Sequence, residues 1–111
     1  MSKAIPVRLL PHTATLEHYL GTVNSVPTYA AAVTLFHVRL EPVQQNAMTS
    51  LGDMKNDRYL LFFDCVNSLP AGMSFTVKDR ITFNGTTVSV RKVTPCYGDS
   101  SAIHHYEVNC V

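Results

Sequence analysis

Histidine and cysteine are the residues of this sequence with the most evident chemical potential, since the chain holds five and three of them. Zinc sites are typically built from close pairs such as Cys-x2-Cys or His-x3-His, and no such pair occurs here. His104 and His105 are adjacent, so on a strand their rings point to opposite faces. An inward meeting of Cys96, His104 and Cys110 is geometrically feasible. The simpler interpretation makes Cys65 and Cys110 small core residues, and the sequence predicts no metal site.

Catalysis by a cysteine would require a histidine placed beside its thiol. Cys96 lies in a turn-rich stretch, and nothing in the sequence positions a histidine against it. The chain also lacks a Gly-x-Ser-x-Gly elbow, a Walker-type phosphate loop and a Gly-x-Gly-x-x-Gly stretch. We expect solvated or turn positions for the dispersed acids Asp53, Asp57, Asp64 and Asp79. The sequence therefore predicts no enzyme activity and no cofactor.

The composition is that of a folded domain with little charge. The length of 111 residues suits one domain, which we assign to residues 1–111. Hydrophobic residues make up 46% of the chain and charged residues 15%, against about 25% charged in average globular proteins. These fractions argue against intrinsic disorder, and a surface poor in charge suits a subunit covered by partners. The odd number of cysteines, without paired spacing, indicates free thiols in a reducing compartment.

Charge and hydropathy argue against two classes of partner. A net charge of +1 provides no basic stripe for sequence-independent binding of nucleic acid. No apolar run approaches the roughly 20 residues of a membrane span, and the first ten residues carry no secretory signal. Four basic residues gather around one predicted hairpin, where they either contact phosphates or form a solvated edge that blocks strand addition: Lys78, Arg80, Arg91 and Lys92.

Alternation of apolar and polar side chains is the main structural signal. In residues 30–40 the alternation predicts a strand that ends at Pro42, with Phe36, Val38 and Leu40 facing the core. The clearest turn is Asn84-Gly85, which lies between two alternating segments and accepts the positive φ angles of a type I′ hairpin.

Further strands are predicted at 13–20, 58–66 and 103–111, and a bulge near Arg91-Lys92. Five or six short strands without a convincing helix indicate an all-β fold. We favour a small antiparallel β-barrel over the alternative, a two-sheet sandwich, because closure removes exposed sheet edges. The insert at about 42–57 has no strong period and is expected to project as a long loop, since inserts of this length are usually functional or disordered.

Four stretches of the C-terminal half together resemble a known group of proteins. They are Phe-Phe-Asp-Cys-Val-Asn-Ser at 62–68, Asp-Arg-Ile-Thr-Phe-Asn-Gly at 79–85, Val-Ser-Val-Arg-Lys-Val at 88–93 and His-His-Tyr-Glu-Val at 104–108. In this combination the chain resembles the minor capsid proteins of phages that infect Gram-positive bacteria. These are among the small head–tail joining proteins of tailed phages and prophages. The resemblance covers residues 58–110 well and 9–40 loosely.

The resemblance implies a structural virion protein at the head–tail junction. Such proteins are similar to a small β-barrel with a long loop, and they form a ring that joins portal and adaptor to the tail and helps close the DNA channel. The implied partners are other copies of the chain, portal, adaptor and tail proteins, and transiently DNA, without a membrane. The implied location is the virion, after assembly in the host cytoplasm.

Candidates for ring or channel contacts lie in the long insert: Gln44, Gln45, Met48, Met54 and Lys55. Two alternatives stay open at this point. One is a small ligand- or metal-binding β-barrel, which would need a polar pocket with convergent Cys96, His104 or Asp64. The other is a tail-completion protein.

Overall fold

The computed structural model describes residues 4–43 and 57–111, which contain one short 3-10 helix and eight strands. The helix is η1 (Val7–Leu9). The strands are β1 (His12–Glu17), β2 (Tyr19–Val23), β3 (Val26–Tyr29), β4 (Val33–Pro42), β5 (Tyr59–Asp64), β6 (Arg80–Phe83), β7 (Thr86–Tyr97) and β8 (Ile103–Cys110). The all-β prediction is confirmed, and most of the long insert predicted at about 42–57 lies outside the described residues.

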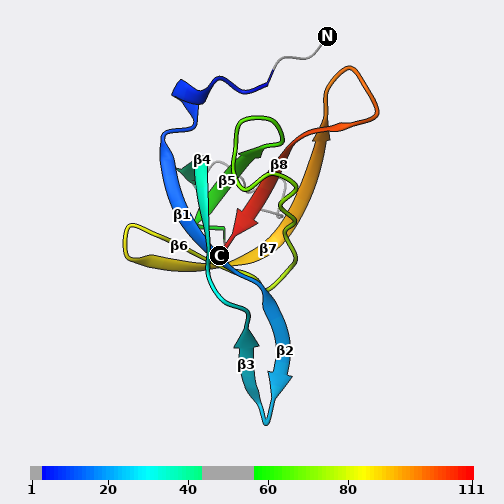
Figure 1. The fold of residues 1–111 in the computed structure, drawn as a ribbon. Helices are drawn as coiled ribbons and strands as arrows, with labels where there is room; N and C mark the ends of the chain where they lie inside the picture. The colour runs from blue at the N-terminus through cyan, green and yellow to red at the C-terminus, as the bar shows by residue number, and fades with distance from the viewer. Residues whose placement is uncertain (1–3, 44–56) are drawn as a thin grey trace.

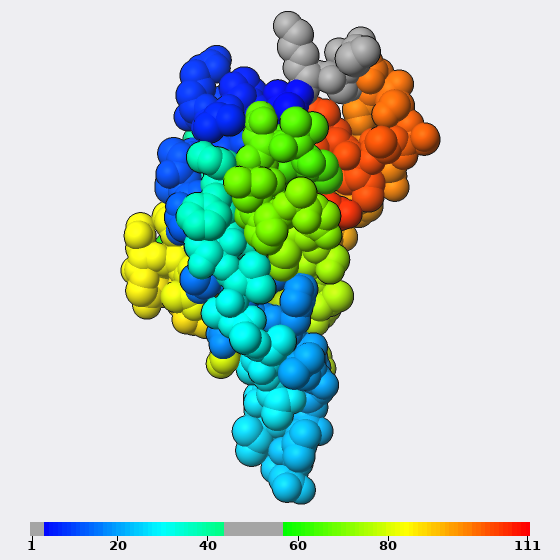
Figure 2. All heavy atoms as spheres, in the orientation of Figure 1, coloured from blue at the N-terminus to red at the C-terminus, as the bar shows by residue number. Residues whose placement is uncertain are grey.

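Six strands form a closed antiparallel barrel in the order β1-β4-β5-β8-β7-β6, and pairing of β6 with β1 completes the ring. The predicted barrel is therefore confirmed over the sandwich. Strands β2 and β3 form a separate two-stranded sheet that extends away from the barrel (Figure 1). The protein consequently has an elongated outline of 49 × 35 × 28 Å, with the hairpin as its narrow end (Figure 2).

Every strand of the barrel sends apolar side chains into a common core, as the alternation predicts. The fully enclosed members include Leu16, Leu35, Val38, Leu61, Phe63, Ile81, Val90, Val108 and Cys110. Burying one side chain of this size contributes about 1.5–3 kcal/mol. Phe75, from the segment between β5 and β6, packs edge-on against Phe63 with ring centroids 5.3 Å apart, so this connection also covers the core.

The predicted facing of β4 is correct at Val38 and Leu40 but wrong at Phe36. Phe36 is 47% exposed while its neighbour Leu35 is enclosed. Strand β4 contains a bulge opposite β1. His12 pairs with Val38 and Ala14 with Leu35, so a step of two residues in β1 corresponds to a step of three residues in β4. The extra residue shifts the alternation by one position at Phe36 and His37, and His37 has a φ of 57°.

Two other local predictions in the C-terminal half, the Asn84-Gly85 turn and the bulge near Arg91-Lys92, are confirmed. Asn84 and Gly85 have φ angles of 51° and 76°, as a type I′ turn requires. The predicted bulge is present in β7, where the register with β8 shifts between Val90 and Lys92. Strand β7 continues to Tyr97, so the turn-rich connection is shorter than predicted.

Three aspartates that the sequence placed in solvated or turn positions are fully buried: Asp57, Asp64 and Asp79. The prediction is wrong because each carboxylate has partners from distant parts of the chain. Asp57 accepts two hydrogen bonds from Arg91, at 2.6 and 3.0 Å, and one from Asn109 at 2.8 Å. These contacts join the start of β5 to β7 and β8.

Candidate functional site

The β2–β3 hairpin exposes several apolar side chains to solvent. Leu20, Val23 and Val26 are exposed to 66%, 59% and 59%, although all three are large hydrophobic residues. The turn Asn24-Ser25 has positive φ at both positions, 51° and 65°, which matches the type I′ geometry of two-residue hairpins. A projecting hairpin that leaves its apolar side chains in water is a candidate contact surface.

Asp79 attaches the root of this hairpin to the barrel. One carboxylate oxygen accepts the backbone N–H of Tyr19 at 2.8 Å, and the other lies 2.9 Å from Nδ1 of His18. Thr76 donates its backbone N–H and its hydroxyl to the same carboxylate, at 2.9 and 2.7 Å. The Arg80 guanidinium stacks 3.6 Å from the ring centre of Tyr29 on the second strand. The root is therefore held firmly while the tip projects.

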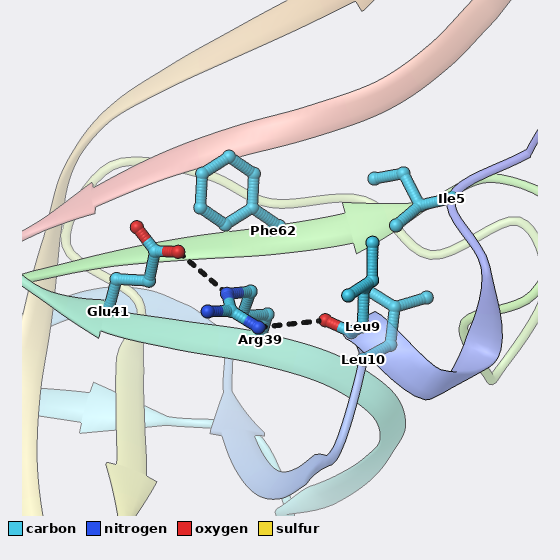
Figure 3. A pocket seen from close by; sticks show the side chains of 6 residues that line it. All are labelled: Ile5, Leu9, Leu10, Arg39, Glu41 and Phe62. Atoms are coloured by element: carbon cyan, nitrogen blue, oxygen red, sulfur yellow. Dashed lines mark hydrogen bonds and ion pairs between the residues drawn. The ribbon is translucent and has the colours of Figure 1, made fainter.

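A groove of about 360 Å³ lies beside the N-terminal segment (Figure 3). The helix η1, which borders it, lies at the end of the molecule away from the hairpin (Figure 1). The walls of the groove are mainly apolar and are formed by Ile5, Leu9, Leu10, Arg39, Glu41 and Phe62. Arg39 donates to Glu41 at 2.6 Å and to the carbonyl of Leu9 at 3.3 Å, so its charge is paired along one side. The groove can accept an apolar segment flanked by polar groups.

Asp64 fixes the N-terminal wall of the groove. Its carboxylate accepts the backbone N–H of Ile5 at 3.0 Å, and the Asn67 side chain donates to the Ile5 carbonyl at 2.8 Å. The same carboxylate accepts the N–H groups of Val66 and Asn67 at 3.0 and 2.8 Å. A buried carboxylate with this set of donors holds the segment before η1 against the end of β5.

The cysteines are free thiols, as predicted, but they do not form the inward group considered from the sequence. Cys110 lies in the core at one end of β8, six residues from His104, or about 20 Å along a strand. Cys96 lies in β7 rather than in a turn, and it pairs with His105 on β8. Cys96, His105 and Glu107 form a partly buried cluster that no pattern in the sequence indicates.

This cluster is poorly suited to nucleophilic catalysis. Burial and the neighbouring Glu107 raise the pKa of the Cys96 thiol, whereas a reactive cysteine needs a lowered pKa. Both ring nitrogens of His105 are engaged, by His104 at 2.9 Å and by Glu107 at 3.0 Å. The arrangement therefore gives no support to a Cys–His nucleophile pair.

Residues 6–110 match the family described as minor capsid protein. The chain belongs to this family. A search of the curated proteins finds no match. Membership makes the chain a minor capsid protein with a structural role in the virion, and it favours binding over catalysis. The closed barrel, the projecting hairpin and the groove are the features of this minor capsid protein that such a role can use.

The contact residues expected in the long insert, Gln44, Gln45, Met48, Met54 and Lys55, lie outside the described residues. The surfaces that are described, the hairpin and the groove, were missed from the sequence. Val-Asn-Ser-Val at 23–26 is a hairpin signal, because asparagine accepts positive φ between two β-branched residues. No comparable local pattern in the sequence predicts the groove, because its residues come from three separate segments.

The solvated edge considered for the four basic residues does not form in this minor capsid protein, because β6 and β7 lie within the closed barrel. Strand β6 is paired on both sides, with β1 and β7. Arg80 lies 3.1 Å from Glu17, Arg91 bonds Asp57, and Lys78 lies over the ring of Tyr19. Within the described residues, no helix is long and apolar enough to cross a membrane.

Proposed function

We propose that this minor capsid protein acts at the head–tail junction, where copies form a ring that joins portal and adaptor to the tail and helps close the DNA channel. The observation that carries the proposal is the presence of two unlike apolar surfaces on one closed barrel. One is the hairpin with Leu20, Val23 and Val26, and the other is the groove beside η1. Rings are built from heterologous contacts, in which each subunit presents two different patches.

The proposed contact places the hairpin of one copy in the groove of the next. The hairpin is narrow and ends in a two-residue turn, so it can enter a groove without moving the barrel that carries it. Its valines would then meet Leu9 and Phe62, which line the groove with accessible apolar surface. Burial of what remains exposed of these three side chains, about 1–2 kcal/mol each, would offset part of the entropy lost on association.

Immunogold labelling of intact virions tests the location. We expect label at the junction of head and tail, and label spread over the capsid shell or confined to the distal tail would contradict the proposal. Tails purified without heads separate this role from tail completion. A junction protein attached to the portal side is absent from such tails, whereas a tail-completion protein is present in them.

Photo-cross-linking tests the contact itself. We expect a photoreactive residue at Val26 to cross-link, in assembled particles, to peptides containing Leu9 or Phe62 of a second copy. The matched control places the same group at Thr87, which is exposed on β7 of the barrel. Cross-links from position 26 that reach only other virion proteins would overturn the copy-to-copy contact.

A further inference from the structure

Cys96, His105 and Glu107 lie together on the outer face of β7 and β8. Tyr106 packs against the core, so its neighbours on β8 point outward. Cys96 pairs with His105 across the two strands, and Glu107 follows two residues later on the same face of β8. One donor atom from each residue lies within 4.8 Å of the other two, and each residue is partly buried.

The surroundings hold the His105 ring in one orientation. Its Nδ1 lies 2.9 Å from Nδ1 of His104, and its Nε2 lies 3.0 Å from Oε2 of Glu107. The ring of Phe62 flanks the imidazole, with ring centroids 6.3 Å apart. Histidines that bind metals characteristically use one nitrogen for the metal while the other is held by a hydrogen bond. His105 has this arrangement, with Nε2 on the side of the cluster.

The three donors define a class of ion. A thiol sulfur, an imidazole nitrogen and a carboxylate oxygen are together the ligands of zinc, whereas calcium and magnesium take oxygen ligands. Bond lengths of about 2.0–2.3 Å in a tetrahedral zinc site put neighbouring ligand atoms about 3.3–3.6 Å apart. The cluster, at 4.8 Å or less, needs only small side-chain rotations to reach that spacing.

We propose that Cys96 Sγ, His105 Nε2 and the Glu107 carboxylate bind a zinc ion on the outside of the barrel. The thiol loses its proton on binding, and the ion takes its place between the thiolate, the imidazole and the carboxylate. Three protein ligands leave a tetrahedral ion one position for water. The ion joins the ends of β7 and β8 where their register shifts between Cys96 and Tyr97. This site holds or fails independently of the role at the head–tail junction.

Cobalt substitution tests the proposal, because Co²⁺ occupies zinc sites and reports thiolate ligation by a sulfur-to-metal charge-transfer band. The full chain, without a histidine tag, is titrated with Co²⁺ and then with Zn²⁺. We expect the band to saturate at one equivalent of cobalt and to disappear when zinc displaces it. Zinc is also expected to raise the Tm of the protein.

Variants decide which residues hold the ion. Cys96→Ala removes the charge-transfer band, and Glu107→Gln shifts its titration to higher cobalt concentration. Cys65→Ala is the matched control, because Cys65 is a partly exposed thiol that lines a different pocket with Phe63 and Tyr106, and the band persists in it. Circular dichroism of the metal-free proteins verifies that each variant is folded. Absence of the band in the wild-type chain, or its persistence in Cys96→Ala, overturns the site.

Discussion

The barrel and the β2–β3 hairpin contain similar apolar residues but differ in how much of them is exposed to water. In the barrel, Leu16, Phe63 and Val108 are at most 1% exposed, and the strand pairing closes on itself. In the hairpin, Val23 and Val26 are each 59% exposed, and both strands have a free edge. An isolated two-stranded hairpin is marginally stable in water, so the barrel must supply the support that the hairpin lacks.

That difference separates the residues that fold this protein from the residues available for contacts. Removing an enclosed side chain from the barrel leaves a cavity, whereas truncating a hairpin valine removes little that touches the rest of the chain. The buried carboxylates connect the two regions, because Asp79 bonds the hairpin root and Asp64 holds the groove wall. The molecule thus combines a rigid body with surfaces whose apolar groups are exposed to water.

The largest expected effect is the loss of barrel stability in Phe63→Ala. Phe63 is 1% exposed and contacts Phe75, so truncation should lower the free energy of unfolding by about 3–5 kcal/mol. The matched variant Val26→Ala should change it by less than about 0.5 kcal/mol, because the side chain lies on the surface. Guanidinium denaturation measures both values. Equal losses in the two variants would remove the distinction between barrel and hairpin.

A smaller effect is expected from Asp79→Asn, which weakens the joint between the two regions. The carboxylate accepts four contacts, and an amide would turn a donor toward groups that themselves donate. We expect a loss of about 2–3 kcal/mol, with faster amide hydrogen exchange at Tyr19 and Ala30 in the hairpin root. Ala30 reports the root because its N–H donates to the carbonyl of His18 at 2.8 Å.

The control for this variant is Asp57→Asn. Asp57 is equally buried, but its carboxylate bonds Arg91 and Asn109 rather than the hairpin. It should destabilise the barrel without a selective rise in exchange at the root. If amide hydrogen exchange at Tyr19 and Ala30 rises equally in both variants, Asp79 stabilises the barrel and does not specifically hold the hairpin root.

Much of the barrel could be predicted from sequence, because alternation is a local consequence of strand geometry. It located β5 and β8, and Asn84-Gly85 located the turn between β6 and β7. It failed at Phe36 because the facing there depends on the irregular pairing of β4 with β1. The Phe36 backbone exchanges hydrogen bonds of 2.9 and 3.0 Å with Leu69, a residue that no local pattern connects to it.

The contact surfaces and the buried acids could not be predicted from the sequence, because they depend on contacts between residues that lie far apart in it. Asp64 meets Ile5 across 59 positions of sequence, and Asp79 meets Tyr19 across 60. Cys96 meets His105 only because the register of β7 and β8 brings them opposite each other. Residue types indicate which groups need hydrogen-bond partners when they are buried. The pairing of the strands in the closed barrel determines which residues lie close enough to be those partners.

The smallest effect is an alkaline destabilisation that arises inside the barrel. Burial raises the pKa of the Cys110 thiol from 9.0 to about 12, with a further contribution from Asp57. Above pH 9 the unfolded chain loses this proton while the folded chain keeps it, so the folded state binds more protons and stability falls as pH rises. Between pH 7 and pH 10 the free energy of unfolding should fall by about 1.4 kcal/mol from this group, since each unit of pKa shift corresponds to about that energy.

Cys110→Ala isolates the contribution, because every other titratable group is the same in the two proteins. The variant is compared with wild type by urea denaturation at pH 7 and pH 10, and only the change with pH is used. The difference between the two changes should be about 1.4 kcal/mol, with wild type losing more. Equal falls in the free energy of unfolding in the two proteins would mean that the Cys110 thiol is solvated in the folded state. The barrel interior around Cys110 would then not exclude water.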